Sequence, residues 1–123
     1  MTASISNVSA AAISGHTLKM SYSNDKGADA DTWSISYSGV KVATQEITWN
    51  KGWFSNRLTS HVHYYSYNRT YKALSFKAGA SADGVAYVFS DWASNTNGES
   101  ACSAGYTMDK KRSGTGYSVA YWK

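Results

Sequence analysis

The sequence predicts a single antiparallel β-sandwich, with a small β-barrel as the alternative fold. Apolar and polar residues alternate with period two along most of the chain, turn-forming Gly, Asn and Asp recur at short intervals, and helical periodicity is nearly absent. The 123 residues are a usual length for one domain, and no repeat or shift in composition divides them. There is no proline, so every backbone N–H can join a sheet. We therefore treat residues 1–123 as one β domain.

Each expected strand is a stretch in which alternate residues point to the same face. Turns containing Gly39, Gly52 and Gly98 help to separate these stretches, and the spacing of all turn signals predicts seven to nine strands. Residues 84–92 carry bulky groups on both faces and are expected to form a central strand. The clearest alternations are Leu18, Met20 and Tyr22; Trp33, Ile35 and Tyr37; Val40, Val42, Ile47 and Trp49; and Tyr117, Val119 and Tyr121, which alternate with Ser118, Ala120 and Trp122.

Composition and charge narrow the class of protein. Aromatic residues make up 15% of the chain and charged residues only 16%, a balance that argues against disorder. The net charge of +4 is mild, so nucleic-acid binding is not the leading expectation. Cys102 is the single cysteine, which excludes an intrachain disulfide and predicts a small buried or half-buried residue. The N-terminal residues lack signal-peptide features, so we expect either an intracellular chain or an exported one whose leader has been removed.

The most unusual stretch is LTSHVHYYSYNRTYKALSF, residues 58–76, in which histidine and tyrosine crowd a predicted strand. Strand geometry sends alternate residues to opposite faces, so one set faces the core and the other faces solvent. The inward set is expected to be Leu58, Ser60, Val62, Tyr64 and Ser66, and the outward set Thr59, His61, His63, Tyr65 and Tyr67, followed by Arg69 in a turn and Tyr71 on the returning strand.

Three interpretations of the outward set remain open. The rings could stabilise the sheet through cross-strand packing, which contributes about 0.2–1 kcal/mol per pair. They could form a sugar platform, because tyrosine offers a flat apolar face and a polar tip. They could also hold a metal ion through the His-x-His spacing, which would need further ligands such as Asp91, Glu99 or Cys102.

A second aromatic cluster lies in residues 49–58, where Trp49 and Trp53 bracket a turn and Phe54 follows. Three large aromatics at one turn are not easily buried together. We expect either an exposed tip that contacts a ligand, a bilayer interface or another subunit, or an arrangement in which Trp49 closes the core and Phe54 folds beneath it. Trp53 and Asn56 are the candidate ligand-binding residues of this cluster.

A third cluster lies in residues 90–100, where Asp91, Trp92 and Asn95 combine an aromatic ring with hydrogen-bonding groups suited to a saccharide. An acidic loop elsewhere in the chain has carboxylates that could collect around Ca²⁺, but it lacks the closing glutamate of an EF-hand and is better explained as a solvated turn. Its carboxylates belong to Asp25, Asp29 and Asp31.

The sequence contains no recognisable catalytic constellation, since it has neither a nucleophile elbow nor a pair of glutamates in a glycosidase context. We therefore expect a non-enzymatic carbohydrate-binding module that needs no metal or cofactor. Its low cysteine and proline content and its wealth of Tyr, Trp, Ser and Gly resemble small fungal or bacterial lectins and defence proteins; the resemblance assigns no residue. The expected partners are glycans or glycoconjugates, with a homodimer or higher oligomer adding avidity.

Two alternatives belong to other classes of function. The first is a membrane-active, cytolytic protein whose tip residues Trp49, Trp53 and Phe54 enter the lipid interface, with Lys51, Arg57 and residues 110–112 near the headgroups. The second is a protein that stacks single-stranded nucleic acid on its aromatic residues.

Overall fold

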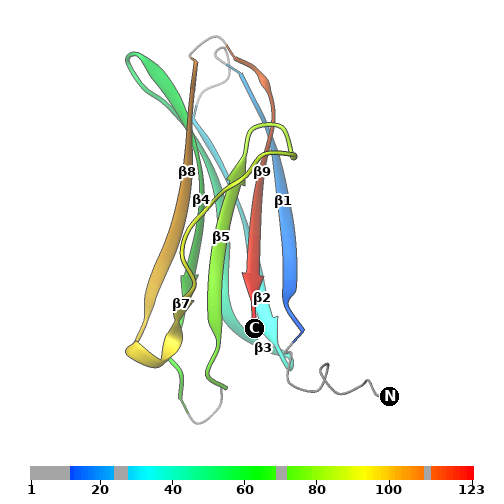
Figure 1. The fold of residues 1–123 in the computed structure, drawn as a ribbon, viewed down its shortest axis with the longest axis vertical. Helices are drawn as coiled ribbons and strands as arrows, with labels where there is room; N and C mark the ends of the chain where they lie inside the picture. Colours follow the sequence, from blue (N-terminus) through cyan, green and yellow to red (C-terminus); the bar gives the residue numbers. More distant parts are fainter. Residues whose placement is uncertain (1–11, 24–27, 69–71, 110–111) are drawn as a thin grey trace, which may run out of the picture.

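The computed structural model, which describes residues 12–23, 28–68, 72–109 and 112–123, is an antiparallel β-sandwich (Figure 1). The described residues form nine strands in two packed sheets, as the sequence predicted, and they do not close into a barrel. The hydrogen-bonded order of the five-stranded sheet is β1 (Ser14–Tyr22), β9 (Gly114–Trp122), β5 (Ser75–Ser81) and β6 (Val88–Phe89), and β7 (Ala93–Ser94) also pairs with β5. The order of the four-stranded sheet is β2 (Asp29–Tyr37), β3 (Val40–Lys51), β4 (Ser55–Tyr64) and β8 (Ser100–Asp109), and a short 3₁₀ helix, η1 (Asn95–Asn97), precedes β8.

Strand β4 confirms the predicted division between core and solvent faces. Its residues from Leu58 to Tyr64 alternate between buried and partly exposed, and Leu58, Val62 and Tyr64 lie in the core. The strand ends at Tyr64 instead of continuing through residue 67 as predicted. The backbone N–H of Tyr65 donates to the carbonyl of Val42, and the chain then leaves the ladder that β4 forms with β8.

Strand β9 turns three small residues to the core, followed on the same face by Trp122. Gly116, Ser118 and Ala120 are buried, whereas Tyr117 and Tyr121 lie partly exposed on the outer surface of the five-stranded sheet. A Cβ atom at position 116 would lie 2.7 Å from a methyl carbon of Leu58, so the interior has room only for glycine there. Small residues on β9 therefore let the large side chains of the opposite sheet reach the centre of the sandwich.

Residues 84–92 are not the central strand that their bulky side chains predicted. Only Val88–Phe89 pairs with β5, at the edge of the five-stranded sheet, and Val85 is 85% exposed. Figure 1 shows this segment crossing in front of β5. A Cβ atom at Gly79 would lie 2.6 Å from the Phe89 ring, so Phe89 packs on the outer face of the sheet. Residues 84–92 therefore carry bulky side chains because this segment packs on the outer face of the sheet, and they do not form a strand buried on both sides.

A layer of polar side chains divides the core into two hydrophobic clusters. Gln45 of β3 is completely buried, and its Nε2 donates to the Ser118 carbonyl at 3.0 Å and to the His16 carbonyl at 3.2 Å. Its Oε1 lies 3.0 Å from His16 Nδ1, and Ser60 Oγ lies 2.6 Å from Ser118 Oγ. The His16 ring also stacks on Trp33, with 3.5 Å between the ring centroids. One cluster surrounds Phe76 and Trp122, and the other surrounds Trp49 and Leu58.

We predict that Gln45→Met destabilises the protein by about 2–4 kcal/mol, because methionine fills the same space but removes the amide that bonds to the buried Ser118 carbonyl and to the partly buried His16. Urea denaturation followed by circular dichroism measures the loss. Thr44→Val, on the partly exposed position next to Gln45, serves as the control and should change stability little. A loss below about 0.5 kcal/mol for Gln45→Met would contradict a stabilising role for the polar layer.

Candidate functional site

The outward residues of β4 and its continuation form a ridge, defined here as His61, His63 and Tyr65. Each histidine contacts a residue from the β8 side of the sheet: His61 Nδ1 lies 2.6 Å from Ser103 Oγ, and His63 Nε2 lies 3.0 Å from Glu99 Oε2. The centroids of the His63 and Tyr65 rings are 5.7 Å apart. All three ridge side chains are partly exposed, so they face water together as predicted.

The ridge can offer hydrogen bonds to a ligand. The contact with Glu99 orients the His63 imidazole, and its second nitrogen has no partner among the described residues. The contact between His61 and Ser103 resembles part of a nucleophilic site, but no carboxylate in the described part of the chain hydrogen-bonds to His61 to complete one. Tyr67 is 51% exposed but lies beyond the end of β4, and the predicted site residues Arg69 and Tyr71 lie outside the described residues.

The ligands suggested for a metal at the ridge are not brought together. Glu99 does contact His63, but Cys102 is buried in the core between the sheets. Asp91 is exposed on the segment that follows β6. Within residues 12–23, 28–68, 72–109 and 112–123, no group of three or more His, Cys, Asp and Glu side chains is placed to hold a metal ion.

The acidic loop suggested for Ca²⁺ is partly a strand. Asp29 and Asp31 belong to β2, and the Oδ1 atom of each accepts a hydrogen bond from the backbone N–H of the next residue at 2.9 Å. Asp25 lies outside the described residues.

The third predicted cluster does not form one surface. Trp92 is half-buried, and the ammonium groups of Lys123 and Lys77 lie 4.2 Å and 5.6 Å from its ring centroid. Asp91 is exposed next to it, but Asn95 is buried, and its Oδ1 accepts a hydrogen bond from the Leu74 N–H at 2.8 Å. The prediction that Asn95 binds ligand is therefore wrong, because its side chain connects η1 to the segment before β5.

The second predicted cluster divides between core and solvent. Trp49 is completely buried and closes one end of the core, which removes it from any ligand or lipid surface. Asn56 is also completely buried, so its predicted role in ligand binding is wrong. Trp53 is 90% exposed and Phe54 is 94% exposed, so Phe54 does not fold beneath the tip. In the part of the chain that the structure describes, no helix is long and apolar enough to cross a membrane.

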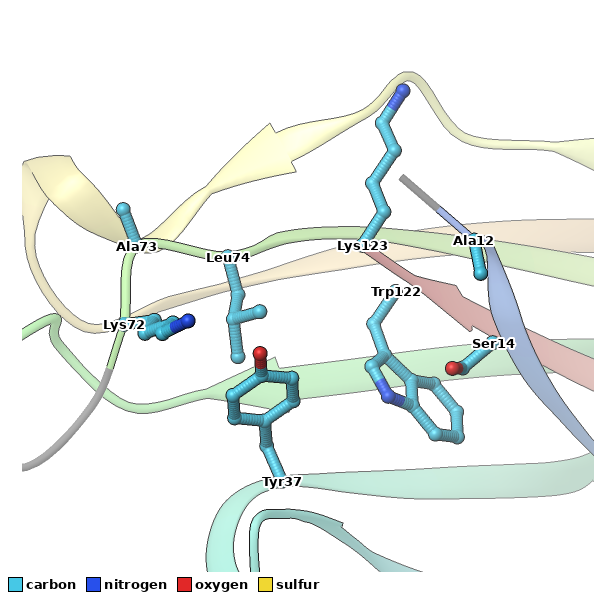
Figure 2. A pocket seen from close by; sticks show the side chains of 8 residues that line it. All are labelled: Ala12, Ser14, Tyr37, Lys72, Ala73, Leu74, Trp122 and Lys123. Carbon is cyan, nitrogen blue, oxygen red and sulfur yellow. The ribbon is translucent and has the colours of Figure 1, made fainter. Parts of the chain in front are cut away.

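A pocket of about 380 Å³ (Figure 2) opens at one end of the sandwich. Figure 1 shows that the C-terminus lies at this end. Two aromatic residues line the pocket: Tyr37 at the end of β2 and Trp122 at the end of β9. Leu74 contributes a buried apolar side chain, and residues from β1 and from the segment before β5 complete the wall. The described residues that line the pocket are Ala12, Ser14, Tyr37, Lys72, Ala73, Leu74, Trp122 and Lys123.

Several hydrogen-bond donors point into this pocket. Figure 2 shows the Lys72 ammonium and the Ser14 hydroxyl directed inward from opposite sides, and the indole nitrogen of Trp122 on the side that faces Tyr37. Lys123 points away from the pocket, because its ammonium packs over Trp92. Among the described residues, no carboxylate side chain lines the cavity. The pocket therefore suits a ligand that has hydrogen-bond acceptors and a face that can pack on aromatic rings.

The sequence prediction missed every residue that lines this pocket. Tyr37 and Trp122 each read as ordinary members of an alternating strand, and they are 85 positions apart in the chain. The segment from Lys72 to Leu74 follows the histidine-rich stretch and has no motif of its own. A partial signal exists at Tyr37, since it directly precedes the turn at Ser38 and Gly39 and must lie at an end of the sandwich.

We predict that the Cys102 thiol reacts slowly. Burial raises the pKa of Cys102, while hydrogen bonds involving Ser90 and the Ala78 backbone lower it to a smaller extent. The reactive thiolate is therefore scarce near neutral pH and poorly accessible. Labelling with a colorimetric disulfide reagent at pH 8 should be at least about tenfold slower in the native protein than in denaturing urea. Equal rates would contradict the buried position.

No protein-family model, no curated protein sequence and no solved structure matches this chain significantly. The function proposed for it therefore rests on the positions of its own residues.

Proposed function

We propose that the protein is a carbohydrate-binding module that holds a sugar in the pocket at the end of the sandwich. The observation that carries this proposal is the combination of the Tyr37 and Trp122 rings with inward-pointing donors from Lys72 and Ser14. A sugar has apolar C–H faces that pack on aromatic rings, and its hydroxyl groups accept hydrogen bonds at their edges. The proposal involves binding alone and no chemical step.

The size and position of the pocket support a small ligand. A volume of about 380 Å³ lies at the lower end of the range of about 300–1,000 Å³ that is usual for ligand pockets. The aromatic walls belong to ordered strands of both sheets, so little conformational entropy is lost when a ligand packs on them. A single site of this kind binds weakly, and presentation on an oligomer or a clustered glycan would raise the apparent affinity.

The ridge is a second candidate site for binding a sugar. His63 and Tyr65 combine a ring and an oriented imidazole on an open sheet face, which is the surface that the sequence prediction selected. The pocket encloses more of a ligand than an open face does, so we place the main site in the pocket. The two locations share no residue and can be tested separately.

We predict that Lys72→Ala and Trp122→Phe each weaken glycan binding by about tenfold or more, because each removes a hydrogen-bond donor while most of the pocket wall remains. A glycan array identifies the sugar, and isothermal titration calorimetry measures the change in Kd. Lys41→Ala removes an exposed lysine from β3 and is the matched control, with no expected effect. The melting temperature of each variant shows whether it remains folded.

Two results would contradict this location. If the double variant His63→Ala with Tyr65→Ala abolishes binding while Lys72→Ala and Trp122→Phe do not, the sugar binds on the ridge. If the wild-type protein binds no glycan on the array, with the fold intact by circular dichroism, the proposed function is wrong.

A further inference from the structure

The tip of the β3–β4 hairpin, residues 52–55, exposes two adjacent aromatic side chains. Trp53 is 90% exposed and Phe54 is 94% exposed, more than any other large hydrophobic residue in the described part of the chain. Figure 1 shows this hairpin projecting from the end of the sandwich opposite the C-terminus. Exposure of this extent is costly in water, because most of the apolar surface of both side chains is hydrated.

The tip is held in a defined shape. The backbone N–H of Gly52 donates to the Ser55 carbonyl at 2.8 Å, and a Cβ atom at Gly52 would collide with that same carbonyl oxygen. The ladder between β3 and β4 is complete up to the pair Lys51 and Asn56, directly below the turn. Trp53 and Phe54 therefore occupy the centre of a tight turn. The turn keeps both side chains away from the core.

Two basic residues flank the tip on its own hairpin. Lys51 and Arg57 are exposed on the hairpin, which has no acidic residue between them. Arg57 is positioned by a hydrogen bond of 2.8 Å from its Nη1 to Thr107 Oγ1 on β8. Arg112 is exposed near the same end, where its guanidinium lies 5.9 Å from the Tyr106 ring centroid. In the register between β4 and β8, the acidic residue nearest to the tip is Asp109 of β8, which pairs with Ser55 of β4.

We propose that this tip docks the protein on a lipid bilayer that contains anionic lipids. Tryptophan and phenylalanine favour the interfacial zone of a bilayer, and lysine and arginine favour the negatively charged headgroups beside it. The shape of the tip favours this occupant over a second copy of the chain. A stable protein interface buries about 800 Å² on each partner, which two side chains on a convex turn do not provide. A bilayer accepts a convex tip without a complementary groove.

The test is sedimentation with glycan-free vesicles of phosphatidylcholine, with and without about 30% phosphatidylserine. We expect the wild-type protein to bind the anionic vesicles and the double variant Trp53→Ser with Phe54→Ser to bind at least about tenfold more weakly. Lys51→Gln should lower binding to the anionic vesicles by about fivefold and leave binding to phosphatidylcholine alone unchanged. Val85→Ser, at a residue that is 85% exposed elsewhere, is the matched apolar control and should bind like the wild type.

Trp53 also supplies a direct signal, because it is far more exposed than the other tryptophans. Its emission should shift to the blue on anionic vesicles and be quenched by brominated lipid, and Trp53→Phe should remove both effects. The proposal is overturned if the wild type does not bind vesicles, or if the double serine variant binds as tightly as the wild type. It is also overturned if ultracentrifugation shows that the wild type is a dimer and the double serine variant is a monomer, since the tip then binds a second copy of the chain. Glycan binding by the double variant should be unchanged, which separates this proposal from the pocket.

Discussion

The buried amide of Gln45 is the contact on which the arrangement of the two sheets depends. It joins β3 to the backbone of β1 and β9, and the hydroxyls of Ser60 and Ser118 extend the same layer to β4. Hydrophobic packing has no direction, so two apolar faces alone can slide over one another. Hydrogen bonds between fixed partners tolerate little displacement, because each buried group left without a partner costs about 1–3 kcal/mol. The polar layer therefore sets the relative position of the sheets, and the hydrophobic clusters fill the space on either side of it.

The two hydrophobic clusters of the core lie toward opposite ends of the sandwich, and these ends differ in structure. The cluster around Phe76 and Trp122 ends in the pocket, since strands of both sheets stop there and Tyr37 lies beside a tight turn. The cluster around Trp49 ends near the turn of the β3–β4 hairpin, and β8 pairs with β4 up to Ser55, directly beside this turn. At one end, the side chains of several segments leave the pocket between them. At the other end, the turn of the β3–β4 hairpin exposes Trp53 and Phe54.

Most of the fold could be predicted from the sequence, because strand alternation and turn residues are local properties. The core face of β4 was correct for that reason. Strand β9 shows the limit of this approach: Gly116 and Ser118 face the interior because Leu58 and Gln45 from the other sheet occupy that space, and no local pattern records this. The pocket could not be predicted, since its lining comes together only when the two sheets pack. Asn95 was misplaced because polar residues in a loop can equally serve the backbone, as its bond to the segment before β5 does.

The positions of the two proposed sites constrain how they can work together. Tyr37 ends β2 and Trp122 ends β9, at the end of the sandwich that holds the C-terminus. Trp53 belongs to the turn between β3 and β4, and Figure 1 shows this hairpin at the opposite end. With the tip in a bilayer, the pocket faces away from the lipid surface. A sugar attached to a lipid headgroup of the same membrane is then out of reach, and the accessible glycans are those on soluble molecules or on extended chains. The two proposed sites share no residue, so binding at one end would neither require nor block binding at the other. Because the polar layer holds the two ends in one rigid relation, simultaneous binding would connect a membrane to a glycan at a distance set by the length of the strands.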